Sequence, residues 1–230
     1  MNDTIQFINS EGLKFFGKVN ASISHELKNI LAIISETSGF LNDLTDLAKQ
    51  GKDLKLSLLE SCNDSIAEEI QRGFDTIKQM NRFAHSVDIP IKEVDLVETL
   101  KLTITLSGFL SAAGKVMLKE TQEPIPPVLT SPVLLQNLIY QLLVFLYPSL
   151  DQETHVGIEL TSHNTHGVYL KFLAPTRKSW DGFPTQKIQR TADILGIELG
   201  AIGSLATLDL WIPHVSNGVV ALAKALEPGV

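Results

Sequence analysis

The stretch that decides the fold of the first part of the chain is ASISHELKNILAII, residues 21–34. It opens a stripe of apolar or small residues in steps of three and four, made up of Ile23, Leu27, Ile30, Ile34, Thr37, Leu41, Leu44 and Ala48. This spacing puts the side chains on one side of a helix and is typical of a helix that packs lengthwise against another. We therefore expect a long helix that ends at the charged, glycine-bearing stretch 49–53.

A second stripe with the same steps follows, made up of Ile66, Ile70, Gly73, Ile77, Met80, Ala84 and Val87. It ends before Pro90, because the residue that precedes a proline disfavours the helical conformation. Two long helices joined by a short reversal form an antiparallel hairpin. Phe74 and Phe83 flank the second stripe and would stay uncovered, so we expect a homodimer in which two hairpins form a four-helix bundle. The sequence leaves open whether the residues up to Lys14 belong to the first helix or form an arm.

Polar residues share the other side of the first helix. If Ile23 and Leu27 face inward, His25 points away from them, because two residues along a helix rotate by about 200°. His25, Asn29, Ala32 and Glu36 then lie together on an exposed face. An imidazole with an ordinary pKa of about 6.5 is mostly neutral and nucleophilic near neutral pH. Taken alone, such a histidine is more often an ordinary residue of a solvated helix surface than a reactive group.

The texture of the sequence changes after Pro90 to short apolar runs separated by Pro, Gly, Asn and His. Strands are expected at 156–160, 168–172 and 207–212, and helices at 95–115, 132–147 and 185–195. The four residues Asn164, Thr165, His166 and Gly167 favour a hairpin turn between the first two strands. We therefore expect an α+β protein, with a helical hairpin domain at 1–89 and an α/β sandwich domain at 90–230.

Composition narrows the classes of partner and compartment. The 230 residues carry a formal net charge of -7, and so acidic a chain argues against nucleic-acid binding, which depends on clustered Lys and Arg. The single cysteine, Cys62, fits a reducing compartment. The N-terminus lacks the pattern of a secretory signal, and the most apolar stretch, 134–150, is too short and too polar for a membrane span. We expect a cytoplasmic protein without membrane contact.

The segment with His25 resembles the H-box in the dimerisation and phosphoacceptor domain of sensor histidine kinases. The resemblance implies that His25 carries a phosphoryl group on one ring nitrogen and that Glu26 orients and deprotonates the other. Asn29 stands where such proteins often have a Thr or Asn that positions water for removing phosphate from a partner's aspartate. The proline that usually follows is replaced by Ile30, so the helix is expected to be straighter.

The second half has the outline of the ATPase-like domain of these kinases without its nucleotide chemistry. Phe145 stands at the position of the metal-binding asparagine, and a phenyl ring offers no oxygen to a hard cation. The loop 173–178 lacks the Asp-x-Gly turn that reads adenine, and Gly182 is part of the only trace of the glycine-rich lid. No phosphate-binding loop of the Gly-x-x-x-x-Gly-Lys-Ser/Thr type occurs. The domain therefore resembles the degenerate ATPase-like domains of dedicated histidine phosphotransferases, which implies no nucleotide or metal on this chain.

Together these features predict a dimeric histidine phosphotransferase that passes a phosphoryl group between His25 and aspartates of response-regulator receiver domains. The receiver would bring the Mg²⁺, Lys28 would help to steer it, and Ile30 and Ala32 would form part of its docking surface. The alternatives are a non-catalytic pseudokinase that serves as an interaction module, a receiver phosphatase, and an active kinase with an unusual ATP site. A metal site at His163 and His166 is disfavoured, because no cysteine or carboxylate stands near them in the sequence.

Overall fold

The structure is a computed structural model that describes residues 2–108, 115–121, 123–150, 153–163, 166–200, 202–203 and 205–226. The chain divides into two compact units, each treated by itself below. The hairpin unit is Asn20–Arg82, and the α/β unit combines Met1–Val19 with Phe83–Val230. The division into domains 1–89 and 90–230 stays a prediction.

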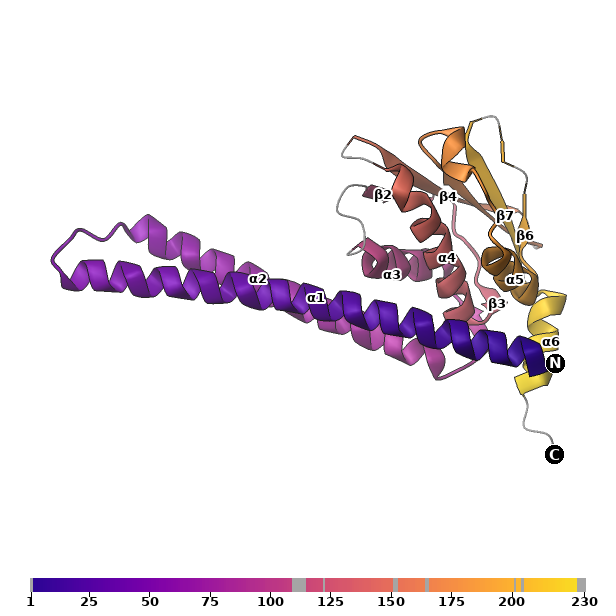
Figure 1. The fold of residues 1–230 in the computed structure, drawn as a ribbon, viewed down its shortest axis with the longest axis horizontal. Coiled ribbons are helices and arrows are strands. Elements are labelled where there is room, and N and C mark those ends of the chain that lie inside the picture. The colour runs from indigo at the N-terminus through magenta and orange to yellow at the C-terminus, as the bar shows by residue number, and fades with distance from the viewer. Residues whose placement is uncertain are drawn as a thin grey trace. The chain divides into compact units, whose positions relative to one another are not determined.

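The hairpin unit consists of the greater part of two long helices and the short reversal that joins them (Figure 1). Helix α1 is Asn2–Lys49 and helix α2 is Leu56–Ala84, so the residues up to Lys14 are helical and form no arm. The reversal lies where the sequence predicts it: the N–H of Gly51 donates to the carbonyl of Ala48 at 3.0 Å. Gly51 has a φ of 80°, a conformation that glycine adopts without steric cost.

The interior of the hairpin unit agrees with the first predicted stripe better than with the second. Ile23, Ile30 and Leu44 of α1 are buried. On α2, Cys62 and Thr76 are buried, whereas Ile70 and Ile77 of the predicted stripe are exposed. Part of the second stripe thus lies outside the seam, and the small or polar side chains of Cys62 and Thr76 are buried there instead.

The α/β unit is built around a mixed sheet in the order β2-β4-β5-β7-β6. Its strands are β2 Lys115–Leu118, β4 His155–His163, β5 Gly167–Leu173, β6 Glu198–Leu199 and β7 Thr207–Pro213. Strand β2 pairs with β4 in parallel, and the other neighbours pair antiparallel. Two short strands, β1 Lys92–Val94 and β3 Val128–Thr130, form a separate antiparallel ribbon.

The helices of this unit are α3 Leu96–Gly108, α4 Pro132–Leu146, α5 Gln186–Leu195 and α6 Asn217–Leu226, with short 3₁₀ helices at His85–Val87, Tyr147–Ser149 and Arg177–Trp180. The α+β class and the main elements are confirmed. The helix predicted for 95–115 is wrong at its end, because Lys115 begins strand β2. Strands β1, β3 and β6 and helix α6 escaped prediction, since they are short or lack a clear period.

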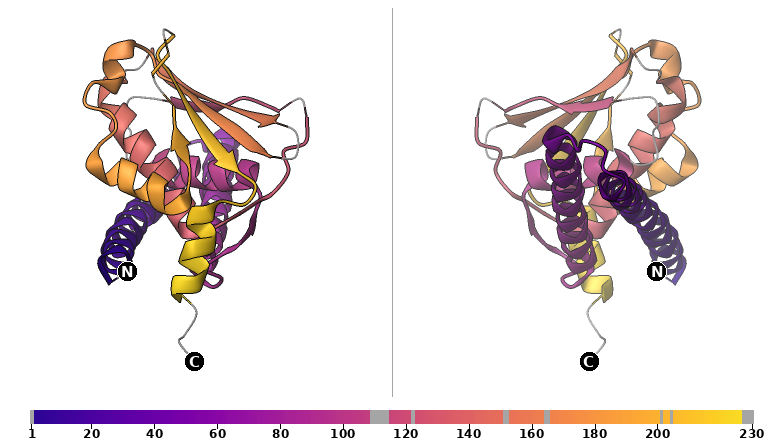
Figure 2. Two further views of the ribbon diagram at one scale, coloured as in Figure 1. Left: turned by 90° about the vertical axis from the view of Figure 1, so that its right-hand side faces the viewer. Right: turned by 90° about the vertical axis from the view of Figure 1, so that its left-hand side faces the viewer.

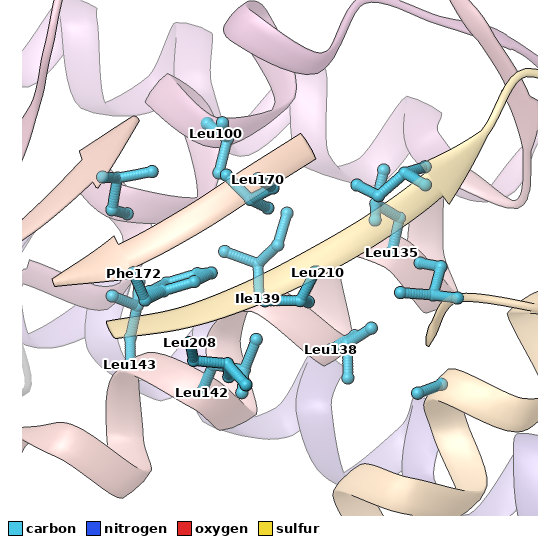
Figure 3. Packing of buried hydrophobic residues seen from close by; sticks show 14 of the residues in the cluster. Leu100, Leu135, Leu138, Ile139, Leu142, Leu143, Leu170, Phe172, Leu208 and Leu210 are labelled. Atoms are coloured by element: carbon cyan, nitrogen blue, oxygen red, sulfur yellow. The ribbon is translucent and has the colours of Figure 1, made fainter. Parts of the chain in front are cut away.

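The hydrophobic core of the unit lies between the helices and one face of the sheet (Figures 2 and 3). Helix α4 is the centre of this core: Leu138, Ile139, Leu142 and Leu143 are fully buried. They meet Leu170, Phe172, Leu208 and Leu210 of the sheet. A helix that is apolar on nearly all sides belongs in the middle of a domain, as its sequence predicts.

The first turns of α1 also belong to this unit. The ring of Phe15 packs edge-on against Phe83 and lies 5.1 Å from the ring of Tyr140 on α4, centroid to centroid. The guanidinium of Arg190 on α5 lies 4.4 Å from the centroid of the Phe7 ring. The N-terminal part of α1 therefore contacts both α4 and α5.

The predicted hairpin turn joins β4 and β5, and its residues Asn164 and Thr165 lie outside the described residues. The strands on either side pair as expected, with His163 opposite Gly167. Within the described parts of the chain, no helix is long and apolar enough to cross a membrane.

Candidate functional site

His25 lies on the outward side of α1 in the hairpin unit. It is exposed, and so are Asn29, Ala32 and Glu36, the residues predicted to share its face. The buried residues Ile23 and Ile30 lie on the other side of the helix. The rotation of about 100° per residue along a helix explains both sets at once. A reactant outside the hairpin can thus reach the imidazole.

The nearest polar partner of the imidazole is Asn29. Its side-chain nitrogen Nδ2 lies 3.3 Å from Nδ1 of His25. The two residues are four apart, so their side chains are neighbours on the helix surface. This contact engages the ring nitrogen closer to the backbone and leaves Nε2 on the outer edge of the ring.

Glu26 points into the hairpin and not along the face of His25. Only 8% of its surface is exposed, and its Oε1 accepts from both Nε and Nη2 of Arg72 on α2, the Nε contact at 2.8 Å. Arg72 also donates from Nη1 to Glu69, at 3.0 Å. The hydrogen bond to Glu26 is the main cause that raises the pKa of Arg72, so this guanidinium stays charged at any physiological pH. The carboxylate of Glu26 is thus bound by Arg72 of the opposite helix.

The residues predicted to bind a partner are placed unequally. Lys28 and Ala32 are exposed on α1. Ile30 is only 3% exposed, and its Cγ2 lies 3.8 Å from the place that a Cβ on Gly73 would occupy. The docking role predicted for Ile30 is therefore wrong, because its side chain is buried between the two helices.

Helix α2 carries an apolar row on its solvent side. Ile70, Phe74 and Ile77 are exposed to 46%, 64% and 41%. Their spacing of four and three residues puts them on one side of the helix. Burying such a row stabilises a complex by roughly 25 cal/mol for each Å² removed from water. The row is therefore a candidate contact for a further protein surface.

In the α/β unit, Phe145 of α4 belongs to an aromatic cluster. Its ring stacks on Trp180 at a centroid distance of 6.2 Å and meets Phe183 edge-on at 5.5 Å. Trp180 and Phe183 are also in edge contact, and the indole N–H of Trp180 donates to the carbonyl of Ala206 at 2.8 Å. The segment after β5 thus packs rings against Phe145 and presents no carboxylate to it.

A cavity of about 250 Å³ lies beside this cluster, between α4, α5 and the first turns of α1. Glu11 lines it and is ion-paired with both Lys14 and Lys187. Burial lowers the pKa of Lys187. On α4, Nε2 of Gln141 donates to Oδ1 of Asn137 at 3.0 Å. A carboxylate of the chain itself therefore engages two of the lysines in this cavity.

Neither the role of Arg72 nor this cavity was predicted from the sequence. Glu26 and Arg72 are 46 residues apart, so no local spacing connects them. Opposite charges facing each other across a predicted hairpin would have been the available signal. Among the residues that the structure describes, no group of three or more His, Cys, Asp or Glu could hold a metal ion.

Comparisons with known proteins complete the description. No protein-family model matches the chain. No curated protein matches its sequence either. Among solved structures, a bacterial phosphotransferase is similar with 10% identity and a TM-score of 0.46, over 86% of this chain and 95% of that one.

Two further structures belong to histidine kinases. The kinase ThkA in complex with the response regulator TrrA aligns over 88% of this chain and 63% of that one, with 15% identity and a TM-score of 0.40. A kinase from Burkholderia phymatum aligns over 82% and 99%, with 14% identity and a TM-score of 0.37.

Proposed function

We propose that the protein is a histidine phosphotransferase of a two-component phosphorelay, which accepts and donates a phosphoryl group at His25 without binding ATP. The observation that carries the proposal is the exposed imidazole of His25 with the Asn29 amide on its Nδ1. An accessible, neutral imidazole is a good nucleophile, and the contact from Asn29 restricts the orientation of the ring.

The transfer step needs little from this chain beyond position. Nε2 of His25 attacks the phosphorus of an aspartyl phosphate on the receiver, a nitrogen–phosphorus bond forms, and the bond from phosphorus to the carboxyl oxygen breaks. The carboxylate of the receiver is the leaving group, and the Mg²⁺ of the receiver neutralises the charge on the transferred oxygens. Phosphoryl transfer depends mainly on alignment and charge neutralisation, so no metal site on the hairpin is required.

The absence of ATP chemistry is supported by the aromatic cluster of the α/β unit. Phe145 is engaged by Trp180 and Phe183, so a ring stack stands where the resemblance to kinases puts a metal-binding asparagine. A hard cation such as Mg²⁺ needs oxygen ligands, and these rings supply none. In this proposal the α/β unit has a structural or docking role.

A receiver would be recognised by the surface around His25. Lys28 and Ala32 are exposed and lie within two turns of the histidine. The ammonium of Lys28 and the methyl group of Ala32 are therefore available to an acidic partner. Glu26 would act on His25 through the negative charge of its carboxylate, which is ion-paired with Arg72. Both roles are parts of the proposal.

We also propose that two copies of the chain pair through their hairpins. The row of Ile70, Phe74 and Ile77 supports this, since a monomer leaves it in water. A second hairpin would cover the row by helix packing of the kind found in four-helix bundles. Sedimentation of the purified chain measures the oligomeric state directly.

A panel of phosphorylated receiver domains tests the proposed activity. Each receiver, labelled on its aspartate, is mixed with the wild-type chain or with His25→Gln, and label on the chain is followed. We expect label on the wild type alone. An equal signal on both chains would show that another residue is the acceptor. Absence of label from both chains would contradict the proposal.

A receiver phosphatase is the second candidate, and the position of Asn29 favours it. An amide beside His25 can hold a water molecule against an aspartyl phosphate that docks there. In that case the receiver loses phosphate faster in the presence of the chain, and the chain itself stays unlabelled. Binding of a receiver without either effect would indicate an interaction module.

A further inference from the structure

The cavity between α4, α5 and the N-terminal part of α1 carries a surplus of positive charge. Three lysines line it, Lys14 and Lys18 on α1 and Lys187 on α5. Among the described residues that line it, Glu11 is the one carboxylate, and it is ion-paired with Lys14 at 2.9 Å and with Lys187. Three cations therefore share one anion, so the cavity suits a further negative charge.

Part of this charge is withdrawn from water. Glu11 is only 7% exposed, and burial lowers the pKa of Lys187. Charges that are shielded from water attract an opposite charge more strongly than charges in bulk solvent do. An ionised group that leaves water also needs an opposite charge to offset the loss of hydration. The lysines of the cavity can provide it to an anion from solution.

A pair of side-chain amides on α4 adds a polar end to the cavity. Asn137 and Gln141 both line it, and Nε2 of Gln141 donates to Oδ1 of Asn137 at 3.0 Å. The other two amide atoms, Nδ2 of Asn137 and Oε1 of Gln141, have no hydrogen-bond partner among the described residues. Asn137 is only 3% exposed, and a buried polar group without a partner is costly.

This result does not depend on which way the amides are turned. One hydrogen bond between two amides uses one nitrogen and one oxygen, so one nitrogen and one oxygen stay unused in either orientation. The pair therefore offers one donor and one acceptor together. A hydroxyl group is the smallest ligand group that can both accept from the one and donate to the other.

The remaining walls of the cavity are apolar and largely aromatic. Phe15, Tyr140 and Phe145 line it, with the rings of Phe15 and Tyr140 5.1 Å apart, centroid to centroid. Aromatic side chains favour stacked or edge-on contact with a further ring. The volume of about 250 Å³ lies below the roughly 300–1,000 Å³ of sites for drug-sized molecules, so it suits a single substituted ring.

We propose that this cavity binds a small aromatic carboxylic acid that carries a hydroxyl group. The carboxylate pairs with the lysines, the ring lies against the aromatic walls, and the hydroxyl bonds to the amide pair of Asn137 and Gln141. The site belongs to the α/β unit, and the proposal does not depend on phosphotransfer at His25. Because the cavity joins α1 to α4 and α5, a bound acid would hold these helices together.

The probe is para-hydroxybenzoate, and its binding to the full chain is measured by isothermal titration calorimetry. Benzoate lacks the hydroxyl group and para-hydroxybenzamide lacks the charge, so each removes one element of recognition. We expect benzoate to bind several-fold more weakly than the probe. The neutral amide should bind about ten-fold more weakly or worse, since hydrogen bonds to charged groups are the stronger ones. ATP, added in competition, should leave the affinity for the probe unchanged.

Lys187→Gln tests the charged end of the site. It should weaken binding of para-hydroxybenzoate by about ten-fold and leave binding of the neutral amide unchanged. The matched control is Lys101→Gln on α3, which removes another ion-paired lysine of the same unit and should change neither. Glu11→Gln should tighten binding of the probe several-fold, because Lys14 and Lys187 lose the carboxylate that competes with it.

The double substitution Asn137→Leu with Gln141→Met tests the amide end. Both replacements keep the approximate shape, and exchanging both partners of a hydrogen bond for apolar groups is nearly neutral for folding. The variant should bind benzoate like the wild type and lose the preference for para-hydroxybenzoate. Thermal unfolding without ligand shows that each variant is folded, and the three compounds test the wild type without any substitution.

Four results would overturn the proposal. They are the absence of binding at millimolar para-hydroxybenzoate, equal affinity of the wild type for the probe and its neutral amide, an unchanged affinity in Lys187→Gln, and weaker binding in Glu11→Gln. Displacement of the probe by ATP at equal concentration would assign the cavity to nucleotides and overturn it as well. None of these measurements involves a receiver or His25, so failure of this proposal leaves the proposed phosphotransfer standing.

Discussion

The hairpin unit and the α/β unit use their polar residues in opposite ways. On the hairpin, His25 and Asn29 are exposed and contact each other, while the charge of Glu26 is turned inward to Arg72. In the α/β unit, the position expected to hold a metal ligand is a ring, Phe145, packed against other rings. The comparison teaches that one unit of a chain can leave its polar side chains accessible to a partner while the other fills the corresponding position with packed rings.

The strongest test of this comparison is a substitution on the hairpin that removes the activity and leaves the stability unchanged. We expect His25→Gln to abolish acceptance of label from a receiver, because no other group on that face can take its place. Its free energy of unfolding should change by less than about 0.5 kcal/mol, as for most exposed substitutions. Labelling and thermal unfolding of the same preparation give both numbers. A large loss of stability in His25→Gln would show that the histidine is structural.

The apolar row on α2 should give a large effect on the assembly of the chain. Phe74→Glu puts a charge in the centre of the proposed dimer contact, and a central aromatic residue at an interface is worth about 2 kcal/mol or more. The dissociation constant of the dimer should therefore rise by roughly thirty-fold or more. Sedimentation over a range of concentrations measures it. Leu205→Glu, at an 81% exposed residue of the α/β unit, is the control and should leave the dimer intact.

A core substitution tests the other side of the comparison. Leu142 on α4 is fully buried, so Leu142→Ala should lower the free energy of unfolding by about 2–5 kcal/mol through lost burial and the cavity it leaves. Chemical denaturation measures the loss, and Leu13→Ala, at a 74% exposed leucine, should change little. Below its melting temperature Leu142→Ala should still accept label at His25. Loss of transfer in the folded variant would mean that the α/β unit takes part in the reaction.

Features that depend on neighbours along the chain could be predicted from the sequence, whereas those that depend on contacts between distant residues could not. The exposed face of His25 and Asn29 was predictable, because the helix repeat fixes it once the buried stripe is known. The ion pair of Glu26 with Arg72 was not, since it joins residues on two helices. Ile70 and Ile77 were misplaced for a related reason: an apolar stripe does not say which neighbour covers it. Short strands such as β6, with only two residues, carry no period at all.

The ion pair inside the hairpin should give a smaller effect than the core. Arg72→Met leaves the buried carboxylate of Glu26 without its donors, and an unsatisfied buried group costs about 1–3 kcal/mol. Glu69→Gln is the matched control, because it removes only the ion pair of Glu69 with Arg72 along α2. Such a pair is worth about 0.3–0.5 kcal/mol. Denaturant titration compares the two. Equal losses would show that Glu26 does not depend on Arg72.

The smallest effect is confined to alkaline solution and concerns the α/β unit. Burial, with a contribution from the charge of Tyr147, raises the pKa of Tyr140 from 10.0 to about 12. The unfolded chain therefore releases this proton near pH 10, whereas the folded chain keeps it. Stability from the neutral phenol is complete below pH 10 and is lost as the pH rises from there toward about 12.

Tyr140→Phe removes the proton and should flatten this part of the pH dependence. The free energy of unfolding of the wild type should fall more steeply than that of the variant between pH 10 and about 12, while the two run parallel at neutral pH. Tyr169→Phe, at a 40% exposed tyrosine of β5, is the control and should keep the steep wild-type decline. Parallel curves for wild type and Tyr140→Phe throughout would mean that Tyr140 is open to water. The contact of Phe15 with the Tyr140 ring would then not close this part of α4, and the contrast between a packed unit and an exposed site would weaken.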